Sequence, residues 1–327
     1  MVKSMPALSA TPLTRGRYAP SPTGDLHVGN LRTALLAWLF SRVQGGQFVL
    51  RVEDLDRPRT RPGATECMLD DLRWLGLDWD EGPDCGGPYA PYTQSERTEI
   101  YRYYLKQLQE RGLLYPCYCS RAEIAQAASA PQQGEDSSRY PGTCRHLSAA
   151  QCRSYEVRGR RPSLRLRVDD ERVISFNDEI AGPITQQVQQ TVGDFILYRA
   201  DGIFAYQFAV VIDDALMHIN QVVRGVDLLS STARQILLYE ILGFPVPRFA
   251  HVPLMLDEQG KRMAKRARSM GLEPLRTASL SPAQIIGQLA ASCGVLSQPE
   301  PIPPKELVQR LQEQPYDIMR STLKEHL

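Results

Sequence analysis

The stretch from Arg17 to Leu39, RYAPSPTGDLHVGNLRTALLAWL, constrains the fold more than any other part of the chain. It opens on a short extended segment, which the prolines and glycine of residues 20–24 end without allowing a helix. A helical period then begins close to Asn30, with one apolar face formed by Leu31, Ala34, Leu35, Trp38 and Leu39. The stretch therefore predicts a strand, a turn and a helix start. The first helical amides and the positive end of the helix dipole suit phosphate, and His27 lies within reach of them.

A second run of β-forming residues, Gln47 to Val52, follows this helix and ends in the acidic segment Glu53-Asp54-Leu55-Asp56. Strand, helix and strand together predict the βαβ unit of an α/β fold with a parallel sheet. Because such sheets bind ligands beyond the carboxyl ends of their strands, Glu53 is a candidate binding residue. Taken alone, the same segment is equally typical of a solvent-exposed acidic turn.

Later runs extend the predicted sheet. Residues 204–214 and 221–227 are apolar runs that end in acids, and we interpret them as successive parallel strands. Residues 186–199, with the turn signal Asp201-Gly202, predict a hairpin that returns the chain to the sheet. Apolar periodicity predicts helices over residues 66–75, 100–108, 282–291 and 305–311.

A length of 327 residues favours two or three domains. Lys plus Arg (38) exceeds Asp plus Glu (37) by one, which excludes a globally basic nucleic-acid binder and requires any RNA contact to be local, as in the basic stretch Arg158–Arg167. No apolar run approaches the ~18 residues of a membrane span. The first 14 residues look like a disordered leader and not a signal peptide, so we expect a cytoplasmic protein.

Seven cysteines argue against a disulfide framework in such a chain. Cys117 and Cys119 form one cluster, and Cys144 follows a polar segment. Three thiols in two clusters suit a closed tetrahedral zinc site that holds an insertion together. For the fourth ligand, His146 or Cys152 would be the choice from chemistry, because imidazole and thiolate are commoner zinc ligands than phenolate. Free structural cysteines are the alternative.

His27-Val28-Gly29-Asn30, preceded by the turn of residues 20–24, resembles the ATP-binding signature of class I aminoacyl-tRNA synthetases in its glutamyl and glutaminyl form. The segments WLGLDWDEGP and Gln94-Ser95-Glu96-Arg97 recur in the same branch. The resemblance implies a Rossmann-like parallel sheet with an inserted zinc-containing acceptor-type domain and a small helical C-terminal region. It divides the chain into a leader (1–14), two catalytic halves (15–112 and 201–257), the insertion (113–200) and a basic loop with the helical region (258–327).

The resemblance also assigns a site. It implies that ATP, with Mg²⁺, is bound by His27, Gly29, Asn30 and Lys265, of which His27 and Lys265 are catalytic. It implies that L-glutamate is bound by Arg17, Tyr18, Ala19, Pro20, Ser21, Glu53, Tyr206 and Arg224. Glu53 would receive the α-amino group, and the two arginines suit two carboxylates. The sequence leaves open which arginine takes which carboxylate, although we favour Arg224 for the side chain.

Lys265 lies in Lys261-Arg262-Met263-Ala264-Lys265-Arg266, which resembles the second class I signature, Lys-Met-Ser-Lys-Ser. Here Arg262 replaces the first Lys, Ala264 replaces the first Ser and Arg266 replaces the last residue. We expect loss of that hydroxyl to loosen the loop. We expect the additional positive charge of Arg to compensate for this effect.

In truncated enzymes of the glutamyl branch, a C-x-C pair followed by Y-x3-C binds zinc through the tyrosine, which implies Cys117, Cys119, Tyr140 and Cys144 as ligands of one structural zinc ion. This pattern and the absence of a helical anticodon-binding region single out the glutamyl-queuosine tRNA(Asp) synthetase family. Its members activate glutamate and esterify it to queuosine in the anticodon loop of tRNA(Asp). The expected partners are therefore L-glutamate, ATP and queuosine-bearing tRNA(Asp). We expect a monomer that does not bind a membrane.

Three alternatives remain at this point. The first is a glutamyl-tRNA synthetase without its anticodon domain, which would charge tRNA(Glu). The second is a related nucleotidyltransferase that uses another acid. The third is a non-catalytic zinc-containing RNA-binding protein, against which Glu53, Tyr206 and Arg224 argue, because a simple RNA binder needs no amino-acid pocket.

Overall fold

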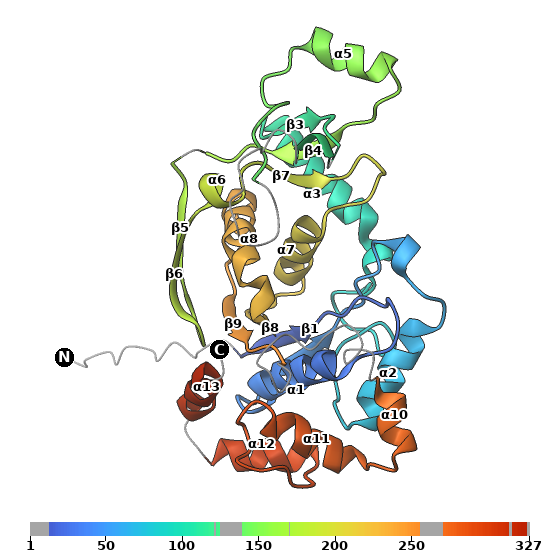
Figure 1. Cartoon of the computed structure of the whole chain (residues 1–327), viewed down its shortest axis with the longest axis vertical. Helices are drawn as coiled ribbons and strands as arrows, with labels where there is room; N and C mark the ends of the chain where they lie inside the picture. The colour runs from blue at the N-terminus through green and yellow to red at the C-terminus, as the bar shows by residue number, and fades with distance from the viewer. Residues whose placement is uncertain are drawn as a thin grey trace, which may run out of the picture.

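The computed structural model describes residues 13–120, 122–124, 139–169, 171–255, 271–313 and 316–325. Within these residues, a four-stranded parallel sheet lies at the centre in the order β2-β1-β8-β9 (Figure 1). Its strands are β1 (Arg15–Tyr18), β2 (Gln47–Leu50), β8 (Gln221–Gly225) and β9 (Arg248–Val252). The strand residues are almost all buried, as expected for a parallel sheet covered on both faces. The parallel α/β fold predicted from the sequence is confirmed.

Helix α1 (Val28–Arg42) crosses from β1 to β2 and completes the predicted βαβ unit. Close packing of α1 on β1 requires Gly16, because a Cβ there would lie 2.0 Å from Oγ of Ser41. Two details differ from the prediction. The helix begins two residues before Asn30, since His27 caps it. It is also buried around nearly its whole circumference, because α11 (Pro282–Ala291) covers the side that faces away from the sheet.

The interpretation of residues 204–214 as a strand is wrong, because this run forms helix α7 (Tyr206–Leu216). Helix α7 and helix α8 (Leu229–Leu242) lie on the face of the sheet opposite α1 (Figure 1). A short, fully buried apolar run has the same composition in a helix and in a central strand, so its residues alone do not distinguish them. The two acids at its end, Asp213 and Asp214, lie inside the helix and are buried.

An antiparallel sheet, ordered β3-β4-β7, lies at one end of the molecule (Figure 1). It consists of β3 (Leu114–Cys117), β4 (Ser163–Leu166) and β7 (Phe195–Tyr198), with α5 (Ala149–Val157) beyond it. The predicted hairpin of residues 186–199 into the parallel sheet is wrong. Residues 188–191 form the short helix α6 (Val188–Thr191), and β7 pairs with β4 in this separate sheet. The Asp201-Gly202 turn does form, since Tyr198 and Phe204 make an antiparallel bridge across it.

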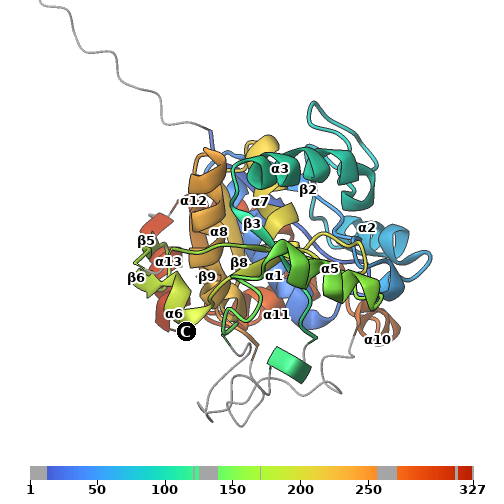
Figure 2. The ribbon, with the colours of Figure 1, turned by 90° about the horizontal axis from the view of Figure 1, so that it is seen from above.

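A long hairpin connects this end of the molecule with the parallel sheet. Its strands are β5 (Val173–Asp178) and β6 (Gly182–Gln187), paired antiparallel. The hairpin lies alongside α8 in both views (Figure 1 and Figure 2), and β5 also contacts β9. Its turn therefore reaches the edge strand of the parallel sheet.

The remaining helices surround the parallel sheet. The predicted helices are confirmed as α2 (Ala64–Trp74), α3 (Thr98–Glu110), α11 and α12 (Pro304–Gln312), while α10 (Leu272–Thr277) and α13 (Tyr316–Glu325) were not predicted. The described part of the chain also contains three 3-10 turns, η1 (Arg57–Arg59), η2 (Gln94–Arg97) and η3 (Val226–Leu228). Among the described residues, none of the helices combines the length and apolar character needed to cross a bilayer.

Two sequence predictions fall largely or wholly outside the described residues. The basic loop with Lys265 is one of them. Of the expected leader only Leu13 and Thr14 are described, and the Thr14 carbonyl accepts a hydrogen bond from the Gln47 amide at 2.9 Å.

Candidate active site

A cavity of about 550 Å³ opens at the carboxyl ends of β1 and β8, next to the start of α1. This is the position where open parallel sheets bind ligands. The cavity lining includes every described residue that the sequence assigned to ATP or glutamate, namely Arg17, Tyr18, Ala19, Pro20, Ser21, His27, Gly29, Asn30, Glu53, Tyr206 and Arg224. The fold thus brings together residues that lie up to 207 positions apart, as Arg17 and Arg224 do.

His27 closes the N-terminus of α1 with its own side chain. Its Nδ1 accepts a hydrogen bond from the Asn30 amide at 3.2 Å, so that amide serves the helix cap. Gly29 allows this arrangement, because a Cβ there would lie 3.2 Å from the imidazole ring. The imidazole is therefore held against the positive end of the helix, on the cavity wall.

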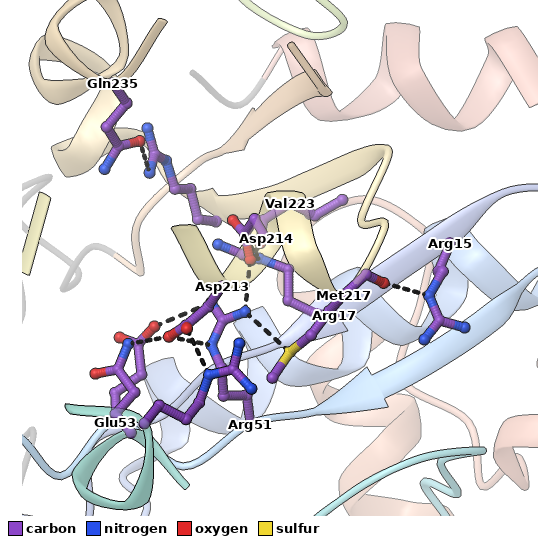
Figure 3. Close-up of polar contacts among 12 residues, drawn as sticks. Arg15, Arg17, Arg51, Glu53, Asp213, Asp214, Met217, Val223 and Gln235 are labelled. Carbon is purple, nitrogen blue, oxygen red and sulfur yellow. Dashed lines mark hydrogen bonds and ion pairs between the residues drawn. The ribbon is translucent and has the colours of Figure 1, made fainter. Parts of the chain in front are cut away.

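Arg17 reaches the cavity from a network of buried charges (Figure 3). Its Nε lies 3.2 Å from Oδ1 of Asp214, and Nη1 of Arg51 lies 2.7 Å from the same oxygen. Nη2 of Arg51 in turn lies 3.2 Å from Oε1 of Glu53. The side chain of Arg51 is completely buried, and its Nε lies 3.7 Å from Asp213. The network fixes Arg17 and Glu53 on neighbouring walls of the cavity.

The network sets the charge state of its acids. Burial raises the pKa of Glu53 to about 7, although the Arg51 and Arg17 guanidiniums act in the opposite direction. For Asp214, burial also favours the neutral form, but Arg17 and Arg51 together hold its pKa below the ordinary value. Asp214 is therefore a permanent counterion of the arginines, whereas Glu53 titrates near neutral pH.

The sequence prediction missed Arg51, Asp213 and Asp214 as parts of this site. Each is a charged residue within or at the end of an apolar run, at positions 47–52 and 204–214. A buried charge requires a partner, so charges placed in apolar runs were a usable signal.

Arg224 projects from β8 and is 4% exposed. Its Nη1 donates to Oε1 of Gln235 at 2.7 Å, and its Nη2 donates to Oγ1 of Thr232 at 2.8 Å. Its guanidinium also lies over the ring of Phe249, with Cζ 5.3 Å from the ring centroid. The orientation of this arginine is thus fixed by α8 and β9.

A second cavity, of about 570 Å³, shares Ser21, Glu53 and Tyr206 with the first. It extends towards the antiparallel sheet, where its lining includes Cys119 and Arg199. The space around Glu53 and Tyr206 is therefore accessible from the insertion.

Three cysteines converge at the end of β3. The sulfurs of Cys117, Cys119 and Cys144 all lie within 4.8 Å of one another. The Tyr140 hydroxyl lies 3.3 Å from the Cys117 sulfur and 3.7 Å from the Cys119 sulfur. The Arg165 guanidinium covers the tyrosine ring, with Cζ 3.7 Å from its centroid. Three thiols and one phenol thus surround one point.

Within this cluster the environment favours the thiolate form of Cys117, whereas burial raises the pKa of the Cys119 thiol to about 12. Burial would raise the pKa of the Cys117 thiol, but Arg165 and the contact with Tyr140 hold it below the ordinary value. Of the His, Cys, Asp and Glu side chains in the described part of the chain, neither His146 nor Cys152 joins the three sulfurs.

The Rossmann-like sheet, the cavity at its carboxyl edge and the helix start capped by His27 define the catalytic domain of a class I aminoacyl-tRNA synthetase. Residues 14–288 match the family described as tRNA synthetases class I (E and Q), catalytic domain, and the chain belongs to this family. The synthetase family predicted from the sequence motifs is confirmed, and the chain is a ligase of the aminoacyl-tRNA synthetase class.

Within this family, the chain is similar to proteins named glutamyl-Q tRNA(Asp) synthetase. It is 54% identical to the one from Symbiobacterium thermophilum over 294 residues, which cover 90% of each chain. It is 49% identical to the one from Nitratidesulfovibrio vulgaris, over 90% of this chain and 91% of that protein. The glutamate–tRNA ligase of S. thermophilum is 49% identical, but the match spans only 52% of its length.

Among solved structures, the glutamate-tRNA synthetase of Elizabethkingia anophelis superposes with a TM-score of 0.79 at 32% identity. The match covers 91% of this chain and 65% of that one.

Proposed function

We propose that this protein activates L-glutamate with ATP and transfers it to queuosine in the anticodon loop of tRNA(Asp). The observation that carries the activation step is the cavity of about 550 Å³, whose lining combines the start of α1 with Arg17, Glu53 and Arg224. The RNA acceptor is supported by the glutamyl-Q tRNA(Asp) synthetases, which this chain matches over at least 90% of both lengths at 49–54% identity.

In the proposed complex, glutamate lies between two arginines. Arg224 binds the side-chain carboxylate and Arg17 the α-carboxylate, each as a charge-assisted pair. Glu53 in its ionised form accepts from the α-ammonium group. Tyr206, Ser21 and the backbone of residues 18–20 complete the lining on the side of β1 and α7.

ATP binds next to glutamate, at the start of α1. His27, Gly29 and Asn30 face its phosphates, and Lys265, which lies outside the described residues, approaches from the basic loop. Bound Mg²⁺ neutralises phosphate charge in reactions of this kind. The protein groups contribute by orienting the phosphates and by stabilising the charge on them.

No enzyme nucleophile takes part in the proposed reaction. A carboxylate oxygen of glutamate attacks the α-phosphorus, the P–O bond to the β-phosphate breaks, and pyrophosphate leaves with the electron pair. A hydroxyl of the queuosine cyclopentenediol then attacks the activated carbonyl. An ester forms, AMP leaves, and the hydroxyl proton passes to a base or to water. The second cavity is the proposed entry for this acceptor, because it reaches Glu53 and Tyr206 from the insertion.

We further propose that Cys117, Cys119, Cys144 and Tyr140 hold one structural zinc ion. The donor set fits, since three sulfurs within 4.8 Å of one another and a phenolic oxygen within 3.3 Å of one of them can form a closed tetrahedral site. This choice favours Tyr140 over His146 and Cys152 as the fourth ligand. The ion would tie the end of β3 to the segment around Cys144.

The proposal includes a monomer that acts in the cytoplasm, where tRNA is found. Transfer of labelled glutamate to purified tRNA(Asp), with and without queuosine, tests the acceptor. We expect labelling of the queuosine-bearing tRNA(Asp) alone. Labelling of only tRNA(Glu) would identify a glutamyl-tRNA synthetase activity, and glutamate-independent RNA binding without transfer would identify a binding protein.

A further inference from the structure

The turn of the β5–β6 hairpin lies against the edge strand β9. The Glu179 amide donates to the Phe249 carbonyl at 2.8 Å, and the Asp178 side chain, 1% exposed, lies beside His251. Oδ2 of Asp178 lies 2.6 Å from Nδ1 of His251, which is itself completely buried. The insertion thus places a buried carboxylate behind a strand of the catalytic sheet.

His251 also faces Arg224, its register partner on β8. Nε of Arg224 lies 3.0 Å from Nε2 of His251, and Oγ1 of Thr232 lies 3.1 Å from the same nitrogen. Asp178, His251 and Arg224 therefore form a continuous chain of hydrogen bonds. It runs from the hairpin turn to the arginine of the amino-acid cavity.

The partners determine the tautomer of His251. An arginine Nε is always a donor, so Nε2 of His251 must be the acceptor. The proton of a neutral ring is then on Nδ1, where it is donated to the Asp178 carboxylate. Burial and the neighbouring Arg224 charge hold the pKa of His251 below its ordinary value, although Asp178 opposes them.

Asp178 is held rigidly as the acceptor. Its Oδ1 accepts from the amides of Ile180, Ala181 and His251 at 3.0, 2.9 and 3.2 Å, which leaves Oδ2 for the imidazole. Carboxylate partners of this kind fix the tautomer and ring orientation of histidine in many sites.

We propose that Asp178 and His251 are positioning residues for glutamate, because they fix the tautomer that accepts from Nε of Arg224 and so orient its guanidinium in the cavity. The proposal rests on the proposed role of Arg224 in binding glutamate. It adds that the hairpin of the insertion contributes to amino-acid recognition in the catalytic domain.

Replacing Asp178 by Asn tests this chain of hydrogen bonds with a minimal change in side-chain shape. The Asn carbonyl can still accept hydrogen bonds from the three backbone amides, and its NH₂ group then faces Nδ1 of His251. Nδ1 of His251 must then accept a hydrogen bond from this NH₂ group, so the ring proton moves to Nε2. There the Nε2–H faces the Nε–H of Arg224, and two donors oppose each other. We expect Asp178→Asn to raise KM for glutamate about tenfold in glutamate-dependent pyrophosphate exchange, with little change in KM for ATP.

The matched control is Glu179→Gln, which makes the same chemical change at the next residue. The Glu179 carboxylate contacts Arg248 at 3.0 Å and takes no part in the chain of hydrogen bonds through His251. KM for glutamate should therefore stay at the wild-type value. Thermal melts of both variants separate a loss of folding from a loss of recognition. An Asp178→Asn enzyme that folds and keeps the wild-type KM for glutamate, or that raises both KM values equally, overturns the proposal.

Nitrogen NMR of ¹⁵N-histidine-labelled wild-type enzyme provides a readout that does not depend on any variant. With five histidines in the chain, the His251 signals can be assigned by comparison with a His251→Gln sample. We expect protonated Nδ1 and unprotonated Nε2. An Nε2–H tautomer in the wild type overturns the proposal even if Asp178→Asn does not fold. If the tautomer is as expected and Arg224→Ala leaves KM for glutamate unchanged, the proposed role of Arg224 is the part that fails.

Discussion

The backbone of His27 forms an isolated antiparallel bridge with Gly271, the first described residue after the basic loop. His27 thus has three structural roles. Its ring caps α1, its side chain lies on the cavity wall, and its backbone pairs with Gly271.

The cap and the proposed phosphate contact of His27 can be separated by substitution. Asn is a good N-cap, so His27→Asn should keep the stability of the fold and lower the pyrophosphate-exchange rate about 100-fold. His27→Ala should lose the cap as well, at a further cost of about 1 kcal/mol in unfolding free energy. Urea unfolding and exchange kinetics of both variants check this. Exchange at the wild-type rate in His27→Asn would restrict His27 to a structural role.

Glu53 makes glutamate binding depend on pH. The folded-state pKa of about 7 exceeds the ordinary value of 4.5, so the folded protein retains a proton that the unfolded chain releases in this range. Glu53 therefore lowers the unfolding free energy as pH rises from about 4.5 to about 7. The ionised carboxylate forms a charge-assisted pair with an ammonium group and the protonated form does not, so we expect the Kd for glutamate to fall from pH 6 to pH 8. Calorimetric titrations should show that Glu53→Gln binds glutamate weakly and without this dependence.

Removal of the central cation should destabilise the buried network strongly. Arg51→Met keeps the volume but leaves Asp213, Asp214 and Glu53 without their shared partner, so we expect a loss of about 3–5 kcal/mol in unfolding free energy. Arg59→Met is the matched control, because Arg59 is exposed and its pair with Asp56 is long, at 3.6 Å. That control should change stability by less than ~1 kcal/mol. Similar urea midpoints for both variants would contradict the assigned role of Arg51.

The cysteine cluster yields a test by metal analysis. Tyr140→Phe removes the proposed oxygen ligand and should lower the zinc retained after dialysis against a mild chelator, whereas Cys152→Ser should retain zinc as the wild type does. Elemental mass spectrometry measures both. Full retention in Tyr140→Phe together with loss in Cys152→Ser would make Cys152 the fourth ligand.

Local patterns were sufficient to predict the first βαβ unit and the cavity. The turn of residues 20–24, the helix after it and the acid at the end of the next strand lie close in sequence, and their spacing fixes their geometry. Arg224 was assigned by resemblance, and the fold places it in the lining of the same cavity as Arg17. Apart from Arg224, these predictions depended on signals that lie within one short stretch of the sequence.

The errors have a common physical cause. Residues 208–215, which form most of α7, are all buried, so this run lacks the exposed polar positions that would reveal a helical period. Asp214, which pairs with Arg51, and Asp178, which pairs with His251, lie 163 and 73 positions away in the sequence, and no local pattern records these pairs. Asp178 is therefore visible as a functional residue only in the folded structure, whereas Asp214 carries the sequence signal of a charge at the end of an apolar run.

The central claim is that the cavity at the carboxyl edge of the sheet activates glutamate. The most direct test is glutamate-dependent exchange of labelled pyrophosphate into ATP by the purified protein without tRNA, compared with Arg224→Ala. We expect exchange that saturates with glutamate, and a KM for glutamate about tenfold higher or more in the variant. No exchange, or exchange that does not require glutamate, would contradict this account.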